Sequence, residues 1–415
     1  MFGVFSNAWK IKDIRNKLLY ILMVLLIFRI GSVIPVPGID MGIMRGDFGG
    51  GGGMLAMLVG GEWGTIFTMG IGPYITASII MQLLTVAVPK LEQLKKDGAE
   101  GRKKINQITR ILAVAMAALQ AFGMTFAWRD AFSHWNIYIH FVAALTMIAG
   151  TMFIMWLSEL LTEKGLGNGA SFIIFANILS ALPGGVLMLY DASIGTIWNA
   201  VAVIVILVLF VVIVGFTALI GEGQRKLPVQ YSKKMVGRQM YGGQSSFIPI
   251  KVNLAGVLPI IFAMSILGFP EMLGNFFPNV DWLARASEIL AVSSPIGAPI
   301  YIILIFAFTF FYASFSINPV EMAENLKKNG GFIPGIRPGK PTSEFIQRTV
   351  SRMSWVGATA YAMVAIAPIV MEWIFRIPIG FGGTTIIIVV GVALEIVKKL
   401  ESQLLMRNYK GFLSQ

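Results

Sequence analysis

Ten apolar segments, each about as long as a bilayer is thick, constrain this chain more than any other feature. A helix needs about twenty apolar residues to cross the hydrocarbon core. Runs of that kind cover residues 18–34, 67–88, 108–128, 137–160, 170–190, 196–220, 253–273, 296–317, 353–374 and 383–400. A mean hydropathy of +0.75 and a charged fraction of 13% exclude an ordinary soluble domain. We therefore expect an all-α polytopic membrane protein with ten transmembrane helices.

The distribution of lysine and arginine predicts an orientation. With the N-terminus inside, the inner connections hold 27 of these residues and the outer connections hold four. Cytoplasmic segments of membrane proteins carry such an excess, so both termini are predicted to be cytoplasmic. A missed or additional helix would break the alternation, so the same count supports ten spans.

Ten spans divide into two sets of five. An odd-numbered half that is duplicated enters the membrane from opposite sides, so the count permits an inverted repeat with a site between the halves. We expect residues 1–190 to hold helices one to five. Residues 191–415 then hold helices six to ten and two large cytoplasmic loops, 221–252 and 318–352. The halves share no residue-level identity, so the repeat is permitted rather than demonstrated by the sequence.

Both of these long loops are rich in basic residues. The first contains KLPVQYSKKMVGRQMYGGQ, whose partial alternation is typical of a protruding hairpin, and the second contains KKNGGFIPGIRPGKP. Membrane topology and attraction to lipid headgroups account for part of this charge. Exposed basic loops of this size are also typical of docking sites for an acidic surface such as RNA or a protein partner.

The second span and the segment before it are unusual. Small and polar residues interrupt its apolar run, among them Gly70, Pro73 and Gln82. They indicate either a helix packed closely against its neighbours or a helix that lines a cavity. Before this span, five glycines precede the apolar segment 54–59, which is too short to cross a bilayer. That segment either folds back into the protein as a small movable element or belongs to a partly disordered outer loop.

The sequence lacks the residues on which catalysis and ion coupling depend. It has no cysteine and two histidines, so no metal and no cofactor are expected. Ion-coupled transporters place Asp, Glu or His at membrane depth, and the central parts of these spans hold almost none. The segment GIRPGKP has Pro334 and Pro341 where a phosphate loop needs Gly and Ser or Thr. We expect a passive channel and not an enzyme. The alternative is an ion-coupled small-solute secondary transporter, and the third hypothesis is a noncatalytic scaffold.

Four segments resemble one family when taken together. They are TIFTMGIGPYITASIIMQLL, MWLSELLTEKGLGNGASFII, VQYSKKMVGRQMYGGQSSFIPIKVNLAGVLP and NLKKNGGFIPGIRPGKPT. In this order they are similar to signature segments and cytoplasmic loops of the SecY family, the central channel subunits of the bacterial Sec protein translocon. The resemblance implies a clamshell of two inverted halves hinged between helices five and six. It also implies a channel that passes unfolded secretory polypeptides across the cytoplasmic membrane and releases membrane helices sideways into lipid.

The resemblance implies a pore closed at its waist by a ring of aliphatic side chains. The positions that match this ring are Ile71, Ile75, Ala170, Ile174, Ile261 and Ile388. Ala170 departs from the family, which usually has a larger aliphatic residue there. Aliphatic groups suit such a pore because they bind no particular substrate, and a closed apolar constriction excludes water and ions by dewetting.

The resemblance also implies a plug and a lateral gate. The plug, at about residues 54–61 and beside the unusual pentaglycine, comprises Met54, Leu55, Ala56, Met57, Leu58 and Val59. The gate lies between helices two and three on one side and seven and eight on the other, and carries Thr76, Gln82, Gln120 and Asn253. These polar side chains either hydrogen-bond across the closed gate or are interhelical contacts worth about 0.6 kcal/mol each.

Partners follow from the same resemblance. The residues implied to dock the SecA motor ATPase or a translating ribosome are Lys233, Lys234, Arg238, Arg337 and Lys340. SecE and SecG are the implied companion subunits, and signal sequences and unfolded polypeptides are the implied substrates. Membrane lipids surround the protein, and the implied location is the bacterial cytoplasmic (inner) membrane.

Overall fold

The structure, a computed structural model, describes residues 8–44, 63–132, 136–194, 197–231, 234–236, 239–241, 245–254, 256–276, 280–377 and 382–413. The chain forms two compact units. Unit 1 comprises Met1–Met188, Ser265–Ser294 and Glu395–Gln415, and unit 2 comprises Leu189–Met264 and Pro295–Leu394.

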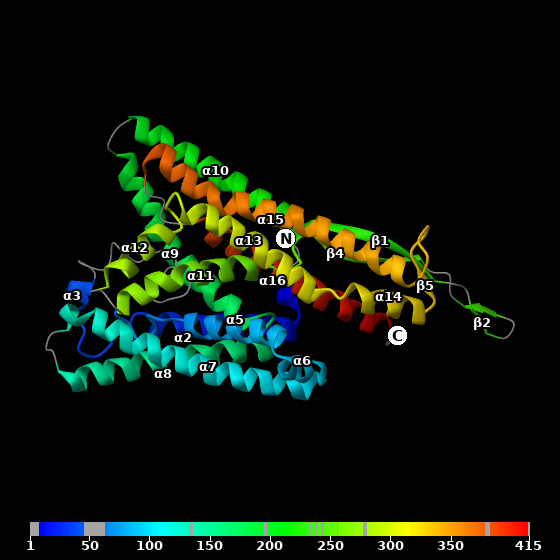
Figure 1. The fold of residues 1–415 in the computed structure, drawn as a ribbon, viewed down its shortest axis with the longest axis horizontal. Coiled ribbons are helices and arrows are strands. Elements are labelled where there is room, and N and C mark those ends of the chain that lie inside the picture. Colours follow the sequence, from blue (N-terminus) through cyan, green and yellow to red (C-terminus); the bar gives the residue numbers. More distant parts are fainter. Residues whose placement is uncertain are drawn as a thin grey trace. The chain divides into compact units, whose positions relative to one another are not determined.

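Long helices dominate both units. The principal ones are α2 (Lys12–Gly31), α5 (Gly72–Ala87), α7 (Gly98–Ala127), α8 (Ile137–Lys164), α9 (Gly169–Ser193), α10 (Ile197–Glu222), α11 (Leu258–Phe276), α13 (Gly297–Ser316), α15 (Lys340–Phe375) and α16 (Gly383–Leu413) (Figure 1). Each of the ten predicted spans coincides with one of these helices. By length and hydropathy alone, six helices in the described ranges qualify as membrane-spanning, or seven if the bent pair α5 and α6 counts as one span.

Several helices extend beyond the predicted spans. Helix α7 begins at Gly98 rather than near 108, and α15 begins at Lys340 rather than near 353. The added turns are rich in Lys, Arg, Glu and Gln, which are good helix formers. Hydropathy locates only the apolar part of such a helix. The thickness of the bilayer sets the length of the apolar segment, and the helix itself can continue beyond the membrane.

Unit 1 packs α5, α7 and α8 against one another through small side chains (Figure 1). On α7, Ala113, Ala117 and Ala121 recur every fourth residue and are buried, so they lie on one face of the helix. On α8, Gly150 lies so close to the backbone of Ile66 that a methyl group there would overlap the Ile66 carbonyl oxygen. Small residues permit such close approach between membrane helices.

Unit 1 also contains four short helical elements. They are α3 (Met41–Ile43), α6 (Pro89–Lys96), the 3-10 helix η2 (Arg129–Ala131) and α12 (Asp281–Leu290). Helix α6 is bent by 99° from α5 at Val88. The proline at the start of α6 cannot donate the backbone hydrogen bond that would continue α5, so the helix breaks there.

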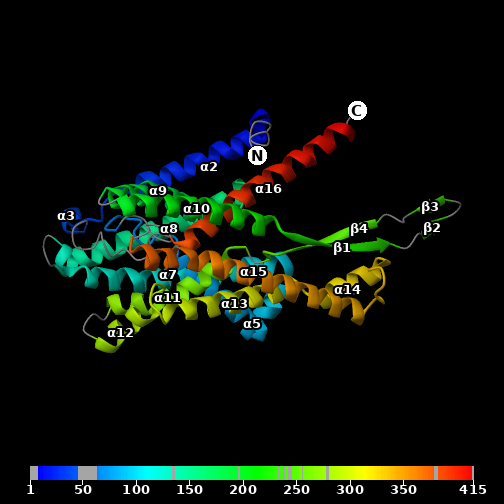
Figure 2. The same ribbon diagram turned by 90° about the horizontal axis from the view of Figure 1, so that it is seen from above.

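The two long basic loops meet in one sheet of unit 2. Strand β1 (Gln224–Tyr231) pairs antiparallel with β4 (Ser245–Lys251) and, on its other edge, with the short strand β5 (Gly331–Phe332). Between β1 and β4, β2 (Lys234–Val236) pairs with β3 (Gln239–Tyr241) in a second hairpin (Figure 2). The hairpin predicted for residues 221–252 is therefore confirmed.

An apolar core anchors this sheet to the helices of unit 2. Leu227, Val229 and Ile250 of the sheet pack with Leu326 of α14 (Pro319–Lys328) and Ile346 of α15. From Lys226 to Gln230, the side chains of β1 alternate between exposed and buried, as expected for a sheet with one covered face. The loops are thus a folded extension of α10, α14 and α15.

Candidate functional site

The first pair of predicted ring residues lies at the start of α5. Gly70 has a positive φ of 51° and closes a turn through its N–H to the carbonyl of Phe67. Pro73 fits the first turn of α5, where its fixed φ is favourable. The N–H of Ile75 then bonds the carbonyl of Ile71 at 3.1 Å, so these two buried side chains lie one above the other on one helix face.

The second pair repeats this arrangement on α9. Asn168 caps the helix, because its Oδ1 accepts a hydrogen bond from the N–H of Ala170 at 3.0 Å. Ala170 and Ile174 are again four residues apart, so they share a face. Ile174 is buried and Ala170 is half-buried.

Unit 2 carries the remaining two ring positions. Ile261 lies in the first turn of α11 and Ile388 in the second turn of α16, and both are buried. Ile71 is thus the N-cap of α5 and the other five positions fall within the first two turns of a helix, each next to a glycine-containing connection. Sequence reasoning did not predict this shared placement. The plug residues 54–59 lie outside the described residues.

Two of the four predicted gate residues make hydrogen bonds within α5. Thr76 Oγ1 donates to the carbonyl of Gly72, and Gln82 Nε2 donates to Ser78 Oγ, both at 3.2 Å and both within α5. Gln120 is half-buried on α7. The Oδ1 atom of Asn253, between β4 and α11, is buried and has no hydrogen-bond partner in the described part of the chain. The latch itself stays a prediction.

Two of the predicted docking residues, Arg337 and Lys340, are exposed. Arg337 lies in the turn between β5 and α15, where Gly335 and Gly339 have positive φ, and Lys340 is the first residue of α15. Thr342 Oγ1 donates to the backbone carbonyl of Arg337 at 2.8 Å and ties this turn to α15. The backbone of Lys234 lies in β2, whereas Lys233 and Arg238 lie outside the described residues.

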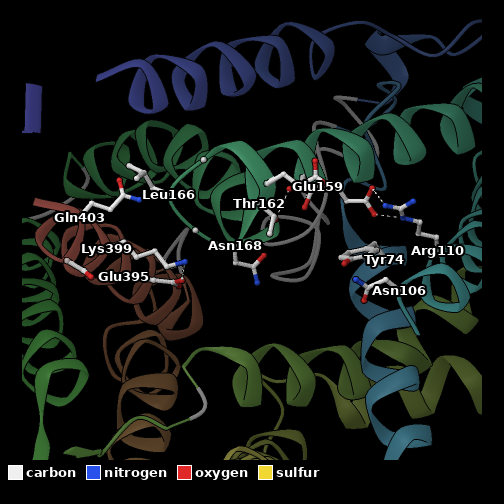
Figure 3. Close-up of a pocket in the computed structure, with 15 residues that line it drawn as sticks. Tyr74, Asn106, Arg110, Glu159, Thr162, Leu166, Asn168, Glu395, Lys399 and Gln403 are labelled. Carbon is white, nitrogen blue, oxygen red and sulfur yellow. Dashed lines mark hydrogen bonds and ion pairs between the residues drawn. The ribbon is translucent and has the colours of Figure 1, made fainter. Parts of the chain in front are cut away.

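Unit 1 also contains a polar cavity of about 730 Å³. Its walls come from α5, α7, α8, the 165–168 connection and the C-terminal part of α16 (Figure 3). In one wall, Arg110 Nε and Nη2 donate to the two carboxylate oxygens of Glu159, each at 2.6 Å. Sequence reasoning did not pair these two residues, which are 49 residues apart in the chain.

Comparison with known proteins decides the family. The family model described as SecY matches residues 65–397. Protein translocase subunit SecY of Halalkalibacterium halodurans is 42% identical over 432 residues, with complete coverage of both chains. The chain belongs to the SecY family. As a SecY family member it is a multi-pass membrane protein of the bacterial membrane with an all-α polytopic fold.

Solved structures agree with the SecY fold. One is described as showing that the plug domain of the SecY protein stabilises the closed state of the translocation channel. It has a TM-score of 0.64 at 20% identity and covers 94% of this chain and 91% of that chain. Sec61 in the canine ribosome-channel complex has a TM-score of 0.59 at 18% identity, with 94% and 91% covered.

Proposed function

We infer that this chain is the protein-conducting channel through which unfolded secretory polypeptides cross the bacterial cytoplasmic membrane. The observation that carries this inference is the full-length similarity to proteins named Protein translocase subunit SecY. The family match spans both segments that hold the first four predicted ring residues, and also both basic loops. It favours the channel over the ion-coupled transporter.

The pore ring is proposed at Ile71, Ile75, Ala170 and Ile174 of unit 1 and at Ile261 and Ile388 of unit 2. Their position at the N-cap of a helix, for Ile71, or in its first two turns, for the other five, supports this assignment. Non-helical backbone at membrane depth is tolerated only where protein or a water-filled cavity surrounds it. Helices that start beside a pore meet this requirement. The non-helical backbone before them, and their first N–H groups, then face the water-filled pore and not lipid.

The plug and the lateral gate are proposed from the SecY family. Residues 54–59 would seal the closed channel, as the plug domain is described to do in the related solved structure. Membrane helices would leave sideways between α5 and α7 on one side and α11 and α13 on the other. Thr76, Gln82, Gln120 and Asn253 are the proposed polar residues of that gate.

Partners are proposed for the two basic loops. The sheet of β1, β4 and β5 and the turn holding Arg337 form one folded extension, which gives a motor or ribosome a rigid surface with fixed charges. The canine relative belongs to a ribosome-channel complex, which supports a ribosome as one partner. SecA, SecE and SecG are proposed as the motor and companion subunits, and both termini are proposed to be cytoplasmic.

A stalled secretory chain tests the channel. A photo-crosslinking amino acid is placed at Ile75 or Ile261, and a secretory polypeptide is halted in transit through reconstituted protein. We expect crosslinks from both positions. Ile204 on α10, which is 61% exposed, is the matched control and should give none. A chain that reaches the vesicle interior without touching Ile75 or Ile261 would contradict the proposed pore.

A further inference from the structure

Helix α12 has an apolar face of which only one half is covered by protein. The residues of this face are Trp282, Leu283, Ala286, Ile289 and Leu290. At about 100° per residue, they occupy roughly a third of the helix circumference. Leu283 is 4% exposed and Leu290 is half-buried, so this half of the face meets protein. Trp282 and Ile289, on the other half, are 69% and 47% exposed.

The covered half of the apolar face lies beside the last turns of α11 (Figure 1). Ser287 is next to Leu283 on the surface of α12, one turn further along. A methyl group added at Gly274 of α11 would lie 3.9 Å from Ser287 Oγ. This packing fixes the rotation of α12 about its own axis. Trp282 and Ile289 therefore face away from α11.

Charged side chains occupy another face of α12. Asp281 and Glu288 are both exposed and, being seven residues apart, lie on the same side of the helix. That side is about 100° from Trp282 around the helix axis. Arg285 is also exposed and lies between Trp282 and the two carboxylates. The exposed surface of α12 thus changes from apolar through basic to acidic around the helix.

Exposure of large apolar groups is not a general property of the short helices in unit 1. In α6, a surface helix of similar length, Leu91 and Leu94 are both half-buried, and no large apolar side chain is exposed. In α12, Trp282 and Ile289 are exposed on one face. Tryptophan is enriched where a membrane meets water, because its ring is apolar and its N–H is polar.

Lipid surrounds the helix that precedes α12 in the chain. In α11, Ile266 and Phe269 are exposed and share one face, as expected for a helix of a multi-pass membrane protein. Helix α11 ends at Phe276 and α12 begins at Asp281. Since α12 starts where the chain leaves the hydrocarbon core, it is at the level of the lipid headgroups.

We propose that α12 is an interfacial helix that lies along the outer leaflet of the membrane. Trp282 and Ile289 insert at the boundary between headgroups and acyl chains, and Asp281 and Glu288 face water. Arg285, whose side chain is long enough to bend toward the headgroups, donates to a lipid phosphate. The charge distribution predicts the outer side for the connection between the seventh and eighth spans. The inference goes beyond the proposed function, because this lipid contact does not require polypeptides to pass through the protein.

An interfacial α12 constrains α11, one of the proposed gate helices. Interfacial Trp and Arg anchors help to set the tilt and rotation of a membrane helix. Because α12 packs against the last turns of α11, insertion of Trp282 holds the outer end of α11 at a fixed depth. Outward movement of α11 then has to carry α12 along the headgroup layer.

Spin labels measure the depth of α12. The chain has no cysteine, so Ile289→Cys and Ala284→Cys each provide a single labelling site, about 140° apart around the helix. Ala284 is exposed beside the charged face and is the matched control. The full chain is placed, one copy per nanodisc, in phosphatidylethanolamine and phosphatidylglycerol. Collisions with oxygen and with a water-soluble nickel chelate are then measured.

We expect the label at position 289 to collide with oxygen and not with nickel, at a depth of about 5–10 Å below the headgroup boundary. The label at position 284 should collide with nickel. Strong nickel collisions at both positions would mean that α12 lies in water, and would overturn the proposal. Protection of position 289 from both reagents would mean that protein covers this face, which overturns it equally.

Substitution of Trp282 tests the anchor itself. Trp282→Glu in the Ile289→Cys protein should move the label toward water, seen as a rise in nickel collisions. Trp198→Glu is the control, because Trp198 is a similarly exposed tryptophan on α10; it should leave the label at position 289 unchanged. A label that keeps its depth when Trp282 is replaced would contradict the assignment of Trp282 as an anchor.

A membrane-impermeant maleimide tests which leaflet α12 contacts. In intact spheroplasts, Ala284→Cys should react, whereas Glu100→Cys, at the start of α7 on the predicted inner side, should react only after the membrane is opened. The reverse pattern would overturn the assignment of α12 to the outer leaflet. None of these measurements depends on export, so a failure of the proposed channel function would leave their outcome unchanged.

Discussion

Arg110 and Glu159 form a bidentate ion pair between α7 and α8, with both N···O distances at 2.6 Å. The planar guanidinium matches the carboxylate in a way that a lysine ammonium cannot. The Arg110 side chain is 49% exposed and the Glu159 side chain 26% exposed, so solvent screens the pair in part. Its role is to fix α7 against α8 beside the polar cavity.

The interaction between Arg110 and Glu159 should have a measurable coupling energy. In a double-mutant cycle with Arg110→Ala and Glu159→Ala, we expect a coupling of about 1 kcal/mol from thermal unfolding in detergent, at the upper end for partly exposed pairs. Arg110→Lys should recover less than half of it. The control pair Arg348 and Glu344, at 3.9 Å and more exposed, should show almost no coupling. Equal coupling for the two pairs would contradict this account.

Close packing between α8 and the segment before α5 leads to a second prediction. Gly150→Ala places a methyl group against the Ile66 carbonyl oxygen, a backbone atom that cannot move alone. We expect a loss of about 1–3 kcal/mol in unfolding free energy and lower export, because the displaced segment leads directly to Ile71. Gly215→Ala is the control, since nothing lies within 4 Å of the added methyl group; it should behave as the unmodified protein. An unimpaired Gly150→Ala variant would contradict the observed packing.

The sequence predicted the helices better than their contacts. Each of the ten apolar runs became a helix because burial in a bilayer demands it, whatever the tertiary arrangement. The predicted hairpin of 221–252 formed for a similarly local reason, its alternating side chains. Strand β5, in contrast, is only Gly331 and Phe332. No local pattern reveals so short a strand, and it forms because β1 offers a free edge.

The candidate site was predictable only in part. The ring residues came from a family resemblance, and their placement at helix starts needed the structure. The pairing of Arg110 with Glu159 arises where α7 and α8 meet. A single sequence contains no periodicity that links positions 49 residues apart, so the polar cavity could not be predicted from it.

Arg337 provides a third prediction, about partner docking. Thr342 holds the backbone of its turn, and the Arg337 side chain is exposed, so its charge is available to an acidic partner surface. We expect Arg337→Glu to reduce motor-driven export about tenfold or more, because a like-charge contact replaces an attraction. Stability should be unchanged. ATP-driven uptake of a pre-protein into vesicles measures the effect, with Arg352→Glu on α15 as a control of equal charge change. Normal export by Arg337→Glu would contradict the docking assignment.

Asn253 provides the last prediction, about the gate. Its Oδ1 is buried without a hydrogen-bond partner in the described part of the chain, and an unsatisfied buried oxygen costs about 1–3 kcal/mol. Asn253→Leu removes that cost in the conformation of this structure. That conformation should therefore become more stable, and transitions out of it should become slower. We expect several-fold slower export of substrates with weakly apolar signal peptides and little change for strongly apolar ones, measured by protease protection in vesicles. Asn329→Leu, an exposed change outside the gate, is the control. If both classes of signal peptide are exported by Asn253→Leu at the unmodified rate, Asn253 has no part in gating.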